Sequence, residues 1–419
     1  MRILWLSHFL PYPPRGGAVQ RSHHLLRHAA RRHEVHLVAL NQRALLPTAE
    51  ALSGAVGALE QLCATVQVLP NRFDGRRLRW AAMVAATFWR TTSYDVNWLH
   101  HPALCPLLDG LAAADAFDLV HVDTLGLMPY ATCVRGLPIV LNHHNVESHM
   151  MARRATAESR WLPRLYLRRE AAKLRRDEQR WCRQAAVNVI VSSLDAERVA
   201  AITGGCETVV VENGVDVDYF RPSPSEASEP GHLVFVGTMD WYPNRDAVQW
   251  FLREVWPALR QRDPRRRLTV IGRDPPGDVR GVPGVSAPGL VEDIRPHVAR
   301  AAVYVCPLRD GGGTRLKVLD ALAMGKPLVG SGLAVEGLDL VDGQHYLRAE
   351  TPGQYVRQIE RLDADPGLRE RLARDGRRLV ERRYSWDALG PQLDEAYDAA
   401  VRVRGAAAHL HAPRWHQRA

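Results

Sequence analysis

Short apolar runs alternate along the chain with segments whose apolar residues recur at helical spacing. These runs lack the polar alternation of a half-exposed strand, so they predict strands buried on both faces, as in parallel sheets. Their alternation with helices predicts strand–helix–strand units and an α/β fold. In the first half of the chain we expect strands at Ile3–Ser7, Val35–Leu40, Val66–Leu69, Leu119–Val122, Ile139–Asn142, Val187–Ser193 and Val209–Glu212. In the second half we expect them at Leu233–Gly237, Leu268–Gly272, Val303–Cys306 and Pro327–Gly330.

One stretch, Arg221–Gly231, interrupts this alternation. It is rich in Pro, Ser and Glu and has no apolar periodicity, which is typical of a linker. The two halves that it separates look alike. We therefore predict an N-terminal domain over residues 1–212, a hinge over 213–231 and a C-terminal domain over 232–385. Ligands of such open sheets bind beyond the carboxyl ends of the strands, so two facing sheets predict a cleft between the domains.

A glycine-rich turn follows the predicted strand Val303–Cys306. After the glycines Gly311–Gly313 we expect a helix to begin at Thr314, with Arg315 and Lys317 in its first turn. Helix N–H groups and the positive end of the helix dipole attract phosphate oxygens, and glycine allows a ligand to approach the backbone closely. The segment predicts a phosphate pocket for a nucleotide-linked ligand. The alternative is an ordinary strand–helix turn that contains glycine.

Length and composition narrow the classes of partner. The chain has 419 residues, of which 46% are hydrophobic and 24% charged, as expected for two globular domains. Its formal net charge of +9 favours acidic partners such as nucleotides, nucleic acid or an anionic membrane surface. None of the six cysteines forms a Cys-x-x-Cys pair, so we expect buried apolar side chains in a reducing compartment rather than a zinc or redox site. The sequence contains no run of about 18 apolar residues, so we expect no membrane span.

Five motifs together carry a family resemblance: LPYPPRGG (Leu10–Gly17), NHHNVES (Asn142–Ser148), VENGVDVDYFRP (Val211–Pro222), FVGTMDWYPNRDAV (Phe235–Val248) and the block Pro307–Gly330. In this order and spacing the chain resembles the retaining GT-B glycosyltransferases of the glycogen-synthase-like family 4. It is most similar to bacterial members associated with exopolysaccharide export. The resemblance implies two Rossmann-like domains with parallel sheets facing a central cleft, with the nucleotide-sugar donor on the C-terminal domain and the acceptor on the N-terminal one.

The resemblance also implies that the helix predicted over residues 386–404 packs back on the N-terminal domain, and that no metal ion or other cofactor is needed. Residues 405–419 are expected to form a disordered tail. Carried over residue by residue, the family motifs place catalytic roles on His144, Arg315 and Lys317. They place donor binding on Gly16, Gly17, Gly237, Val291, Gly312, Gly313, Thr314 and Asp320, and acceptor binding on Arg15, Asn145 and Glu147.

Several of these assignments leave alternatives open. Of the adjacent His143 and His144 only one is expected to be functional, because neighbouring side chains at a strand end point in different directions; His144 fits the motif better. An imidazole there would donate to a sugar hydroxyl or stabilise developing charge. Arg15 and Arg21 are phosphate contacts or surface charges. Glu147 binds the acceptor or caps the next helix.

The chain departs from the family pattern on the donor side. Many relatives carry an Arg and Lys pair after the first strand of the second domain, and here Arg315 and Lys317 are expected to replace it. The family's Glu-x7-Glu pair falls on Gly312 and Asp320, so only the second carboxylate remains, one methylene shorter. We expect Asp320 to accept the ribose hydroxyls.

Two further stretches of the N-terminal half suggest a surface function. Residues Arg153–Arg183 hold eleven basic and four acidic side chains, with an apolar face on a helical pattern. Trp80–Trp89 is an apolar run bracketed by arginines. Both fit helices at an anionic membrane surface, and both also fit solvated helices over a buried stripe.

The sequence therefore predicts a cytoplasmic, peripheral membrane glycosyltransferase. It would move a sugar from a nucleotide-diphosphate sugar to a glycan or lipid-linked acceptor, in exopolysaccharide or other cell-surface glycan synthesis. We expect no nucleic acid partner, because the basic stretches only partly interleave with aromatic residues. The alternatives are a catalytically silent sugar-nucleotide-binding protein and a GT-B-type sugar-nucleotide epimerase.

Overall fold

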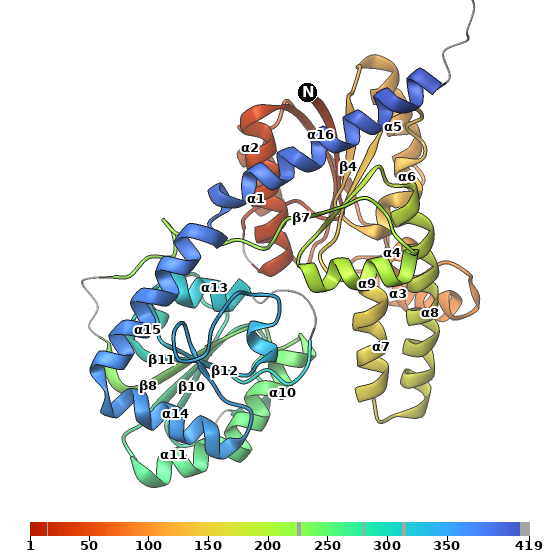
Figure 1. Ribbon diagram of the computed structural model, residues 1–419. Helices are drawn as coiled ribbons and strands as arrows, with labels where there is room; N and C mark the ends of the chain where they lie inside the picture. The colour runs from red at the N-terminus through yellow and green to blue at the C-terminus, as the bar shows by residue number, and fades with distance from the viewer. Residues whose placement is uncertain (15, 224–227, 280, 312–315, 411–419) are drawn as a thin grey trace, which may run out of the picture. The chain divides into compact units, whose positions relative to one another are not determined.

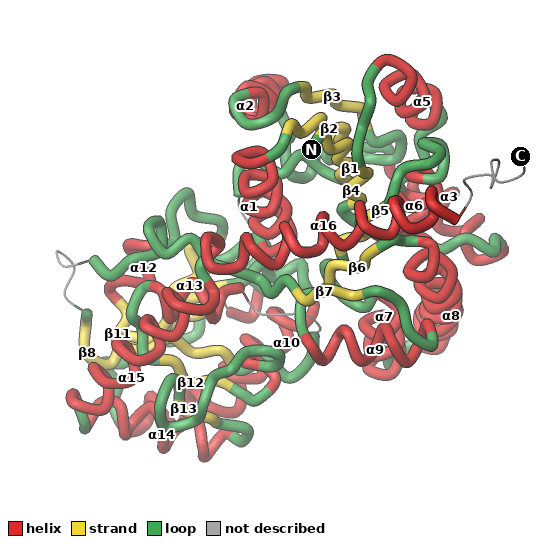
Figure 2. Tube along the Cα trace, turned by 45° about the horizontal axis from the view of Figure 1, so that its top comes forward, coloured by secondary structure: helices red, strands yellow, loops and turns green. Residues whose placement is uncertain are grey.

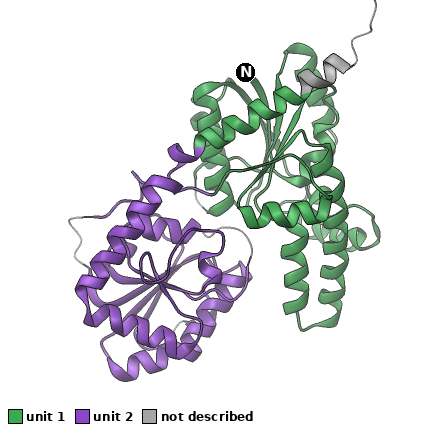
Figure 3. Cartoon of the chain, viewed as in Figure 1, with its two compact units in different colours: residues 1–212, 390–419 green, residues 213–389 purple. Residues whose placement is uncertain are grey.

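The computed structural model describes residues 1–14, 16–223, 228–279, 281–311 and 316–410, with side chains described up to residue 403. The chain forms two compact units (Figure 3). Unit 1 comprises Met1–Glu212 and Gly390–Ala419, and unit 2 comprises Asn213–Leu389. The chain thus returns to unit 1 after completing unit 2.

The sheet of unit 1 is wholly parallel. In the described residues it has seven strands in the order β3-β2-β1-β4-β5-β6-β7. They are β1 (Arg2–Ser7), β2 (Glu34–Asn41), β3 (Thr65–Pro70), β4 (Leu119–Val122), β5 (Ile139–Asn142), β6 (Val187–Ile190) and β7 (Thr208–Val210). The strand order reverses between β1 and β4, which makes this the switch point of a doubly wound sheet.

Helices cover both faces of this sheet, as the red and yellow tubes of Figure 2 show. They are α1 (Gly17–Arg32), α2 (Ala49–Glu60), α3 (Arg77–Trp89), α4 (Tyr94–Trp98), α5 (Leu104–Ala114), the 3₁₀ turn η1 (Leu125–Leu127), α6 (Met128–Ala131), α7 (Glu147–Ala157), α8 (Trp161–Gln184), α9 (Ser193–Thr203) and α16 (Trp386–Leu410). The core strands β1 and β4 lie between helices, so the side chains of Ile3, Leu4 and Val120 are fully buried.

Helix α16 runs along unit 1 (Figure 1), and polar contacts from its middle part hold it there. The carboxylate of Asp394 contacts His28 on α1 at 3.1 Å, and the hydroxyl of Tyr397 lies 3.1 Å from Nδ1 of His121 on β4. Gly390 lies so close to α1 that a Cβ atom there would fall 2.1 Å from the ring of His28.

Unit 2 has a second parallel sheet, with the order β10-β9-β8-β11-β12-β13 among its described residues. Its strands are β8 (Glu229–Val236), β9 (Arg267–Ile271), β10 (Val285–Gly289), β11 (Ala301–Cys306), β12 (Leu328–Gly330) and β13 (Leu347–Arg348). The helical elements are α10 (Tyr242–Trp250), η2 (Phe251–Val255), α11 (Trp256–Arg262), η3 (Gly277–Val279), α12 (Arg295–Arg300), α13 (Leu316–Ala323), η4 (Leu333–Val335), α14 (Pro352–Ala364), α15 (Pro366–Leu379) and η5 (Val380–Tyr384). Here the switch point lies between β8 and β11.

The predicted α/β class with parallel sheets in both halves is confirmed, and several details are corrected. The expected linker Arg221–Gly231 ends in strand, because β8 already begins at Glu229. The C-terminal helix continues to Leu410, past the start of the expected tail. The basic stretch Arg153–Arg183 is two helices rather than one, since α7 ends at Ala157 and α8 begins at Trp161.

The cysteines also depart from expectation. Cys105 on α5 and Cys133, just after α6, form a disulfide with their Cα atoms 5.7 Å apart. The prediction that all six cysteines are reduced, buried side chains was therefore wrong for this pair. It missed the bond because the two cysteines are 28 residues apart and meet only through the packing of α5 on α6. Cys63, Cys182 and Cys306 are buried and form no disulfide with any cysteine of the described residues.

A search of the described helices found none with both the length and the apolarity that a membrane crossing requires.

Candidate active site

Three polar side chains meet at the switch point of unit 1. His8 follows β1, Asp123 follows β4 and His144 follows β5. Because the carboxyl ends of parallel strands meet at one edge of the sheet, the three lie together, with one nitrogen or oxygen of each within 4.8 Å of the others. This His8–Asp123–His144 cluster occupies the place where ligands bind to doubly wound sheets.

Asp123 is the buried centre of the cluster. Its Oδ2 accepts hydrogen bonds from the hydroxyls of Ser22, at 2.5 Å, and Ser7, at 3.3 Å, and its Oδ1 accepts one from the amide of Asn142 at 2.7 Å. Burial alone would raise the pKa of Asp123, but the nearby imidazoles of His144, His8 and His121 outweigh it and hold that pKa well below its usual range. Asp123 is therefore a permanent carboxylate.

Arg21 on α1 is linked to this carboxylate through Asn142. Our prediction that Arg21 is a phosphate contact or a surface charge was wrong. Arg21 is neither, because it is buried and donates to Oδ1 of Asn142 at 2.8 Å and to the carbonyl of Val211 at 2.8 Å. Burial lowers the pKa of Arg21 to about 10, so it stays charged at neutral pH. Asn142 thus links a buried guanidinium to the Asp123 carboxylate by accepting from one and donating to the other.

His144 is oriented by Asp123. Its Nε2 lies 3.1 Å from the backbone carbonyl of Asp123 and 3.4 Å from its Oδ1. A carbonyl can only accept, so Nε2 carries the proton, and in the neutral ring Nδ1 is an acceptor. The ring of His8 meets that of His144 edge-on, with centroids 5.6 Å apart. Burial, followed by the neighbouring His144, lowers the pKa of His8 to about 3, so His8 is neutral at pH 7.

The neighbouring His143 points into the core instead. It is buried, and its Nε2 donates to Oδ1 of Asn188 on β6 at 3.1 Å. The two adjacent histidines therefore differ as expected: His143 holds two strands together, and His144 lies in the polar cluster.

Glu147 opens α7 next to Asn145, whose side chain it contacts. It does not cap that helix: Glu178 of α8 does so, by accepting from the backbone N–H of Ser148 at 3.0 Å. Burial, with help from Asp95 and Glu178, raises the pKa of Glu147 to about 8. Glu147 is thus mainly protonated at neutral pH. Of its two expected roles, helix capping is excluded and acceptor binding stays a prediction.

The glycine loop after β1 leads directly into α1. Gly16 has a φ of +88° with nothing within 4 Å of the place where a Cβ would lie, so its backbone conformation, not its packing, calls for glycine. Gly17 is the first residue of α1, and its N–H belongs to the first turn, whose backbone donors have no partner within the helix. Arg15 lies outside the described residues.

A second polar site lies at the switch point of unit 2. Lys317, in the first turn of α13, donates to Oδ1 of Asn244 on α10, and its Nζ lies 4.8 Å from the ring centroid of Phe235 on β8. A Cβ atom on Gly237 would lie 2.7 Å from that Nζ, so any other residue after β8 would force the lysine to shift. This residue is the Gly237 predicted from the sequence, and its role here is to leave room for Lys317.

Four predicted site residues of the glycine loop, Gly312, Gly313, Thr314 and Arg315, lie outside the described residues. Their roles stay predictions. The described glycine before them, Gly311, has a φ of +122°, which side-chain-bearing residues rarely adopt.

Asp320 lies one turn after Lys317 on α13. With Tyr304, Met324 and neighbouring apolar residues it lines a small cavity of about 10 Å³, roughly the room that one water needs. Its Oδ1 is inaccessible and has no hydrogen-bond partner among the residues that the structure describes. Burial raises the pKa of Asp320 to about 8 even though Lys317 opposes the shift. The expected ribose acceptor is therefore mostly protonated at neutral pH.

This burial gives a test of Asp320. Because its folded pKa is raised, the carboxyl costs stability as pH rises from its unfolded value of 3.8 toward 8. We expect Asp320→Asn to raise the melting temperature at pH 8 more than at pH 5 and to weaken nucleotide binding. Thermal unfolding at both pH values, with and without nucleotide, measures this. An equal shift at both pH values would contradict the raised pKa.

Val291, Lys326 and Lys173 lie away from this polar site or have contacts of another kind. Val291 is half-buried and packs against the core of unit 2, so its predicted contact with the base stays a prediction. Lys326 donates to the carbonyl of Ala301 at 2.9 Å and also to that of Ala299, close to the end of α12. Lys173 is buried against Glu170. Of the three lysines in the sequence, Lys317 is thus the one at a switch point.

Sequence reasoning missed His8, Asp123 and Asn142, and it assigned the wrong roles to Arg21. A usable signal was present for the first three, since each lies at the end of a buried strand, where parallel sheets collect their polar groups. Arg21 gave no such signal, because an arginine on a helix after a glycine loop is usually exposed.

Two doubly wound units, each with polar groups at its switch point, have the architecture of GT-B glycosyltransferases. Comparison with protein families agrees: residues 15–219 match the family described as "Glycosyltransferase Family 4", and residues 230–365 match "Glycosyl transferases group 1". The chain belongs to the GT-B glycosyltransferases of family 4.

The named relatives share only a low sequence identity with this chain. A phosphatidyl-myo-inositol mannosyltransferase of Mycobacterium leprae is 27% identical over 53% of this chain and 61% of its own length. A D-inositol 3-phosphate glycosyltransferase of Salinispora arenicola is 30% identical over 47% of this chain and 50% of its own length. The matched region thus spans between half and two thirds of these relatives.

Solved structures match along almost the whole chain. Sucrose-phosphate synthase from Thermosynechococcus elongatus has a TM-score of 0.70 at 14% identity, covering 97% of this chain and all of that one. Anabaena HepE in complex with UDP-glucose has a TM-score of 0.63 at 15% identity, covering 95% of this chain and all of that one. At these identities the similarity establishes the fold.

Proposed function

We propose that this protein is a retaining glycosyltransferase that moves a sugar from a nucleotide-diphosphate sugar to a hydroxyl of a glycan or lipid-linked acceptor. Membership of family 4 supports the reaction class. The UDP-glucose of the HepE complex supports a nucleotide-sugar donor, and the name of the Mycobacterium relative supports a lipid-linked acceptor. A role in exopolysaccharide or other cell-surface glycan synthesis, at the cytoplasmic face of a membrane, is part of the same proposal.

The placement of Lys317 carries this proposal. Its ammonium group lies at the carboxyl end of β8, positioned by Asn244 and admitted by Gly237. A leaving nucleotide diphosphate develops negative charge on its phosphate oxygens, and a preorganised cation lowers the barrier to its departure. Arg315 would add a second, bidentate partner for the same phosphates.

His144 would hold a sugar hydroxyl. Its Nε2–H is engaged by Asp123, so the neutral ring offers Nδ1 as an acceptor for a hydroxyl proton. The acceptor hydroxyl would attack from the side that the diphosphate leaves, and a phosphate oxygen would take its proton. This route uses no carboxylate pair as acid and base.

The reaction we propose needs no metal ion. The His8–Asp123–His144 cluster has the donor types of a metal site, two imidazoles and one carboxylate. Both oxygens of Asp123, however, already accept hydrogen bonds from Ser7, Ser22 and Asn142. We propose that the cluster binds sugar hydroxyls, with Asp123 as the group that orients His144.

A donor screen tests the function. The protein is heated with a panel of UDP-, GDP- and dTDP-sugars, and we expect one donor to raise the melting temperature, because a ligand of the folded state stabilises it. That donor is then incubated with hydroxyl acceptors, and the anomeric configuration of the product is read by NMR, with and without EDTA. Protection by no donor, or protection without turnover, would contradict the proposal; the latter outcome points to a silent sugar-nucleotide-binding protein. Loss of turnover in EDTA would reassign the cluster as a metal site.

A further inference from the structure

Helix α3 is apolar yet almost uncovered. Of its thirteen residues Arg77–Trp89, only Met83 and Thr87 are buried. The side chains of Leu78 and Trp89 are 88% and 79% exposed, and Trp80 is also exposed. Surface helices of folded proteins usually bury such residues along one stripe, so an apolar helix left in water indicates a binding surface.

The start of α8 adds to this surface. Trp161 is 66% exposed, and Leu162 and Leu165 are exposed as well. The ring of Tyr166 on α8 stacks on Phe88 at the end of α3, with centroids 6.4 Å apart. The exposed apolar residues of both helices therefore belong to neighbouring elements of unit 1.

On α8 most arginines are exposed to solvent, whereas the acidic side chains are buried or half-buried. Its arginines at 168, 169, 175, 176, 180 and 183 are exposed. Its three acidic residues are not: Glu170 and Glu178 are buried, and Asp177 is half-buried. Four more exposed arginines, at 76, 77, 79 and 90, flank or begin α3. The charge that these two helices present to solvent is thus predominantly positive, although the sequence of α8 contains acidic residues.

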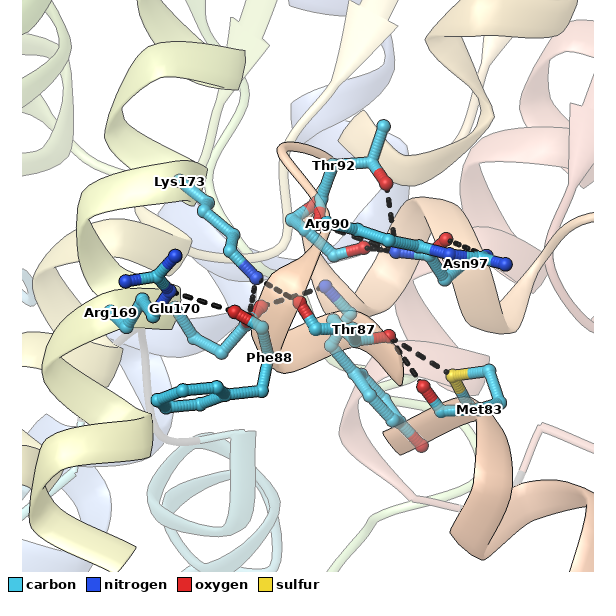
Figure 4. A network of polar contacts seen from close by, with 11 residues as sticks. Met83, Thr87, Phe88, Arg90, Thr92, Asn97, Arg169, Glu170 and Lys173 are labelled. Carbon is cyan, nitrogen blue, oxygen red and sulfur yellow. Dashed lines mark hydrogen bonds and ion pairs between the residues drawn. The ribbon is translucent and has the colours of Figure 1, made fainter. Parts of the chain in front are cut away.

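A buried polar network fixes α3 to α8 (Figure 4). The ammonium of Lys173 donates to Glu170 at 2.6 Å and also to the carbonyl of Thr87, while Glu170 accepts from the backbone N–H of Tyr94 at 2.8 Å. Arg169 donates to the carbonyl of Phe88 at 2.7 Å. These bonds satisfy the end of α3 from α8, so the two helices present their exposed residues as one rigid surface.

We infer that α3 and the first half of α8 form a docking surface for an anionic phospholipid bilayer. Tryptophan and leucine side chains insert at the level of the headgroups, and arginines around them pair with lipid phosphates. A protein partner would need acidic side chains placed to match these arginines, whereas an anionic bilayer supplies negative charge over the whole face. The inference deepens the proposed function, and it rests on that function only for the use of a lipid-linked acceptor.

Vesicle binding tests the surface without any donor. The full-length protein is floated with phosphatidylcholine vesicles that do or do not contain phosphatidylglycerol, at low and high salt. We expect binding to the anionic vesicles, which weakens with salt, and at least a tenfold loss in W89A/W161A. The control is W241A, which removes an exposed tryptophan from unit 2. Unchanged thermal unfolding checks that each variant is folded.

Three outcomes would overturn the inference: no binding of the wild type to anionic vesicles, equal binding of W89A/W161A, or an equal loss in W241A. A self-association in solution that W89A/W161A abolishes, without vesicle binding, would assign the surface to a second copy of the chain instead. Sugar transfer to a soluble acceptor by a protein that ignores vesicles would leave the proposed function standing. Vesicle binding without turnover of any donor would support the docking surface and contradict the proposed function.

Discussion

Replacing Lys317 by methionine is expected to lower the rate of sugar transfer about 100- to 1000-fold. The ammonium is positioned before the donor arrives, by Asn244 and by the space above Gly237, so it stabilises the departing diphosphate without reorganising. Methionine keeps the length and the apolar stem but not the charge. The loss should therefore appear in kcat more than in KM, and single-turnover assays with the donor found by the screen measure it.

Lys326 provides the matched control. It lies nine residues further along the same segment, but its ammonium caps backbone carbonyls near the end of α12. Lys326→Met should lower the melting temperature, through the loss of buried hydrogen bonds, and leave the rate nearly unchanged. A rate in Lys317→Met within a factor of three of the wild type, or an equal loss in both variants, would remove Lys317 from the mechanism.

Much of the fold was readable from the sequence, because buried parallel strands leave apolar runs that no other element explains. The strands at Leu119–Val122 and Ile139–Asn142 were predicted residue for residue. The strands β10 and β13 were missed for a physical reason. β10 contains Pro288 and is only half-buried, and β13 has just two residues, so neither leaves an apolar run.

The candidate site was readable only in part. Lys317 and Gly237 could be expected there because the lysine begins a helix after a glycine-rich turn and the glycine directly follows a buried strand. The roles of Arg21 and Asp123 depend instead on which elements pack together, since Arg21 reaches Asn142 across 121 positions of sequence. Burial then changes their chemistry: the protonation of Asp320 and Glu147 at neutral pH follows from desolvation, which no motif encodes.

Desolvation also makes unit 1 sensitive to acid, and the expected effect is large. His24 and His121 are buried with pKa values lowered to about 3, and His143 with one lowered to about 4, in each case mainly by burial. In the unfolded chain each has the ordinary value of 6.5. Because the folded state holds them neutral, stability is complete above pH 6.5 and falls as the unfolded state gains protons below it.

At pH 5 each of these histidines costs about 2 kcal/mol relative to pH 7, and His8, whose pKa is lowered equally far, adds as much, which gives about 8 kcal/mol in all. The raised pKa of Glu147 acts in the opposite direction and returns about 2–3 kcal/mol over the same interval. Since a domain is typically stable by about 5–15 kcal/mol, we expect unit 1 to open between pH 5 and pH 4. Hydrogen exchange followed by mass spectrometry separates the units by peptide. Unit 2 serves as the internal reference, because burial lowers the pKa values of its His232 and His345 but the carboxylates of Glu229 and Asp375 oppose that shift.

His121 allows the cause to be isolated. Its ring stacks on Trp5 with centroids 3.6 Å apart, and its buried Nε2 has no hydrogen-bond partner in the described part of the chain. His121→Phe keeps the stacking and removes the titrating group, at the cost of the contact with Tyr397 at every pH. The variant should be less stable at pH 7, yet lose about 2 kcal/mol less than the wild type on going to pH 5. If both proteins lose the same stability over that interval, acid opening has another source, and the neutral buried histidines do not control it.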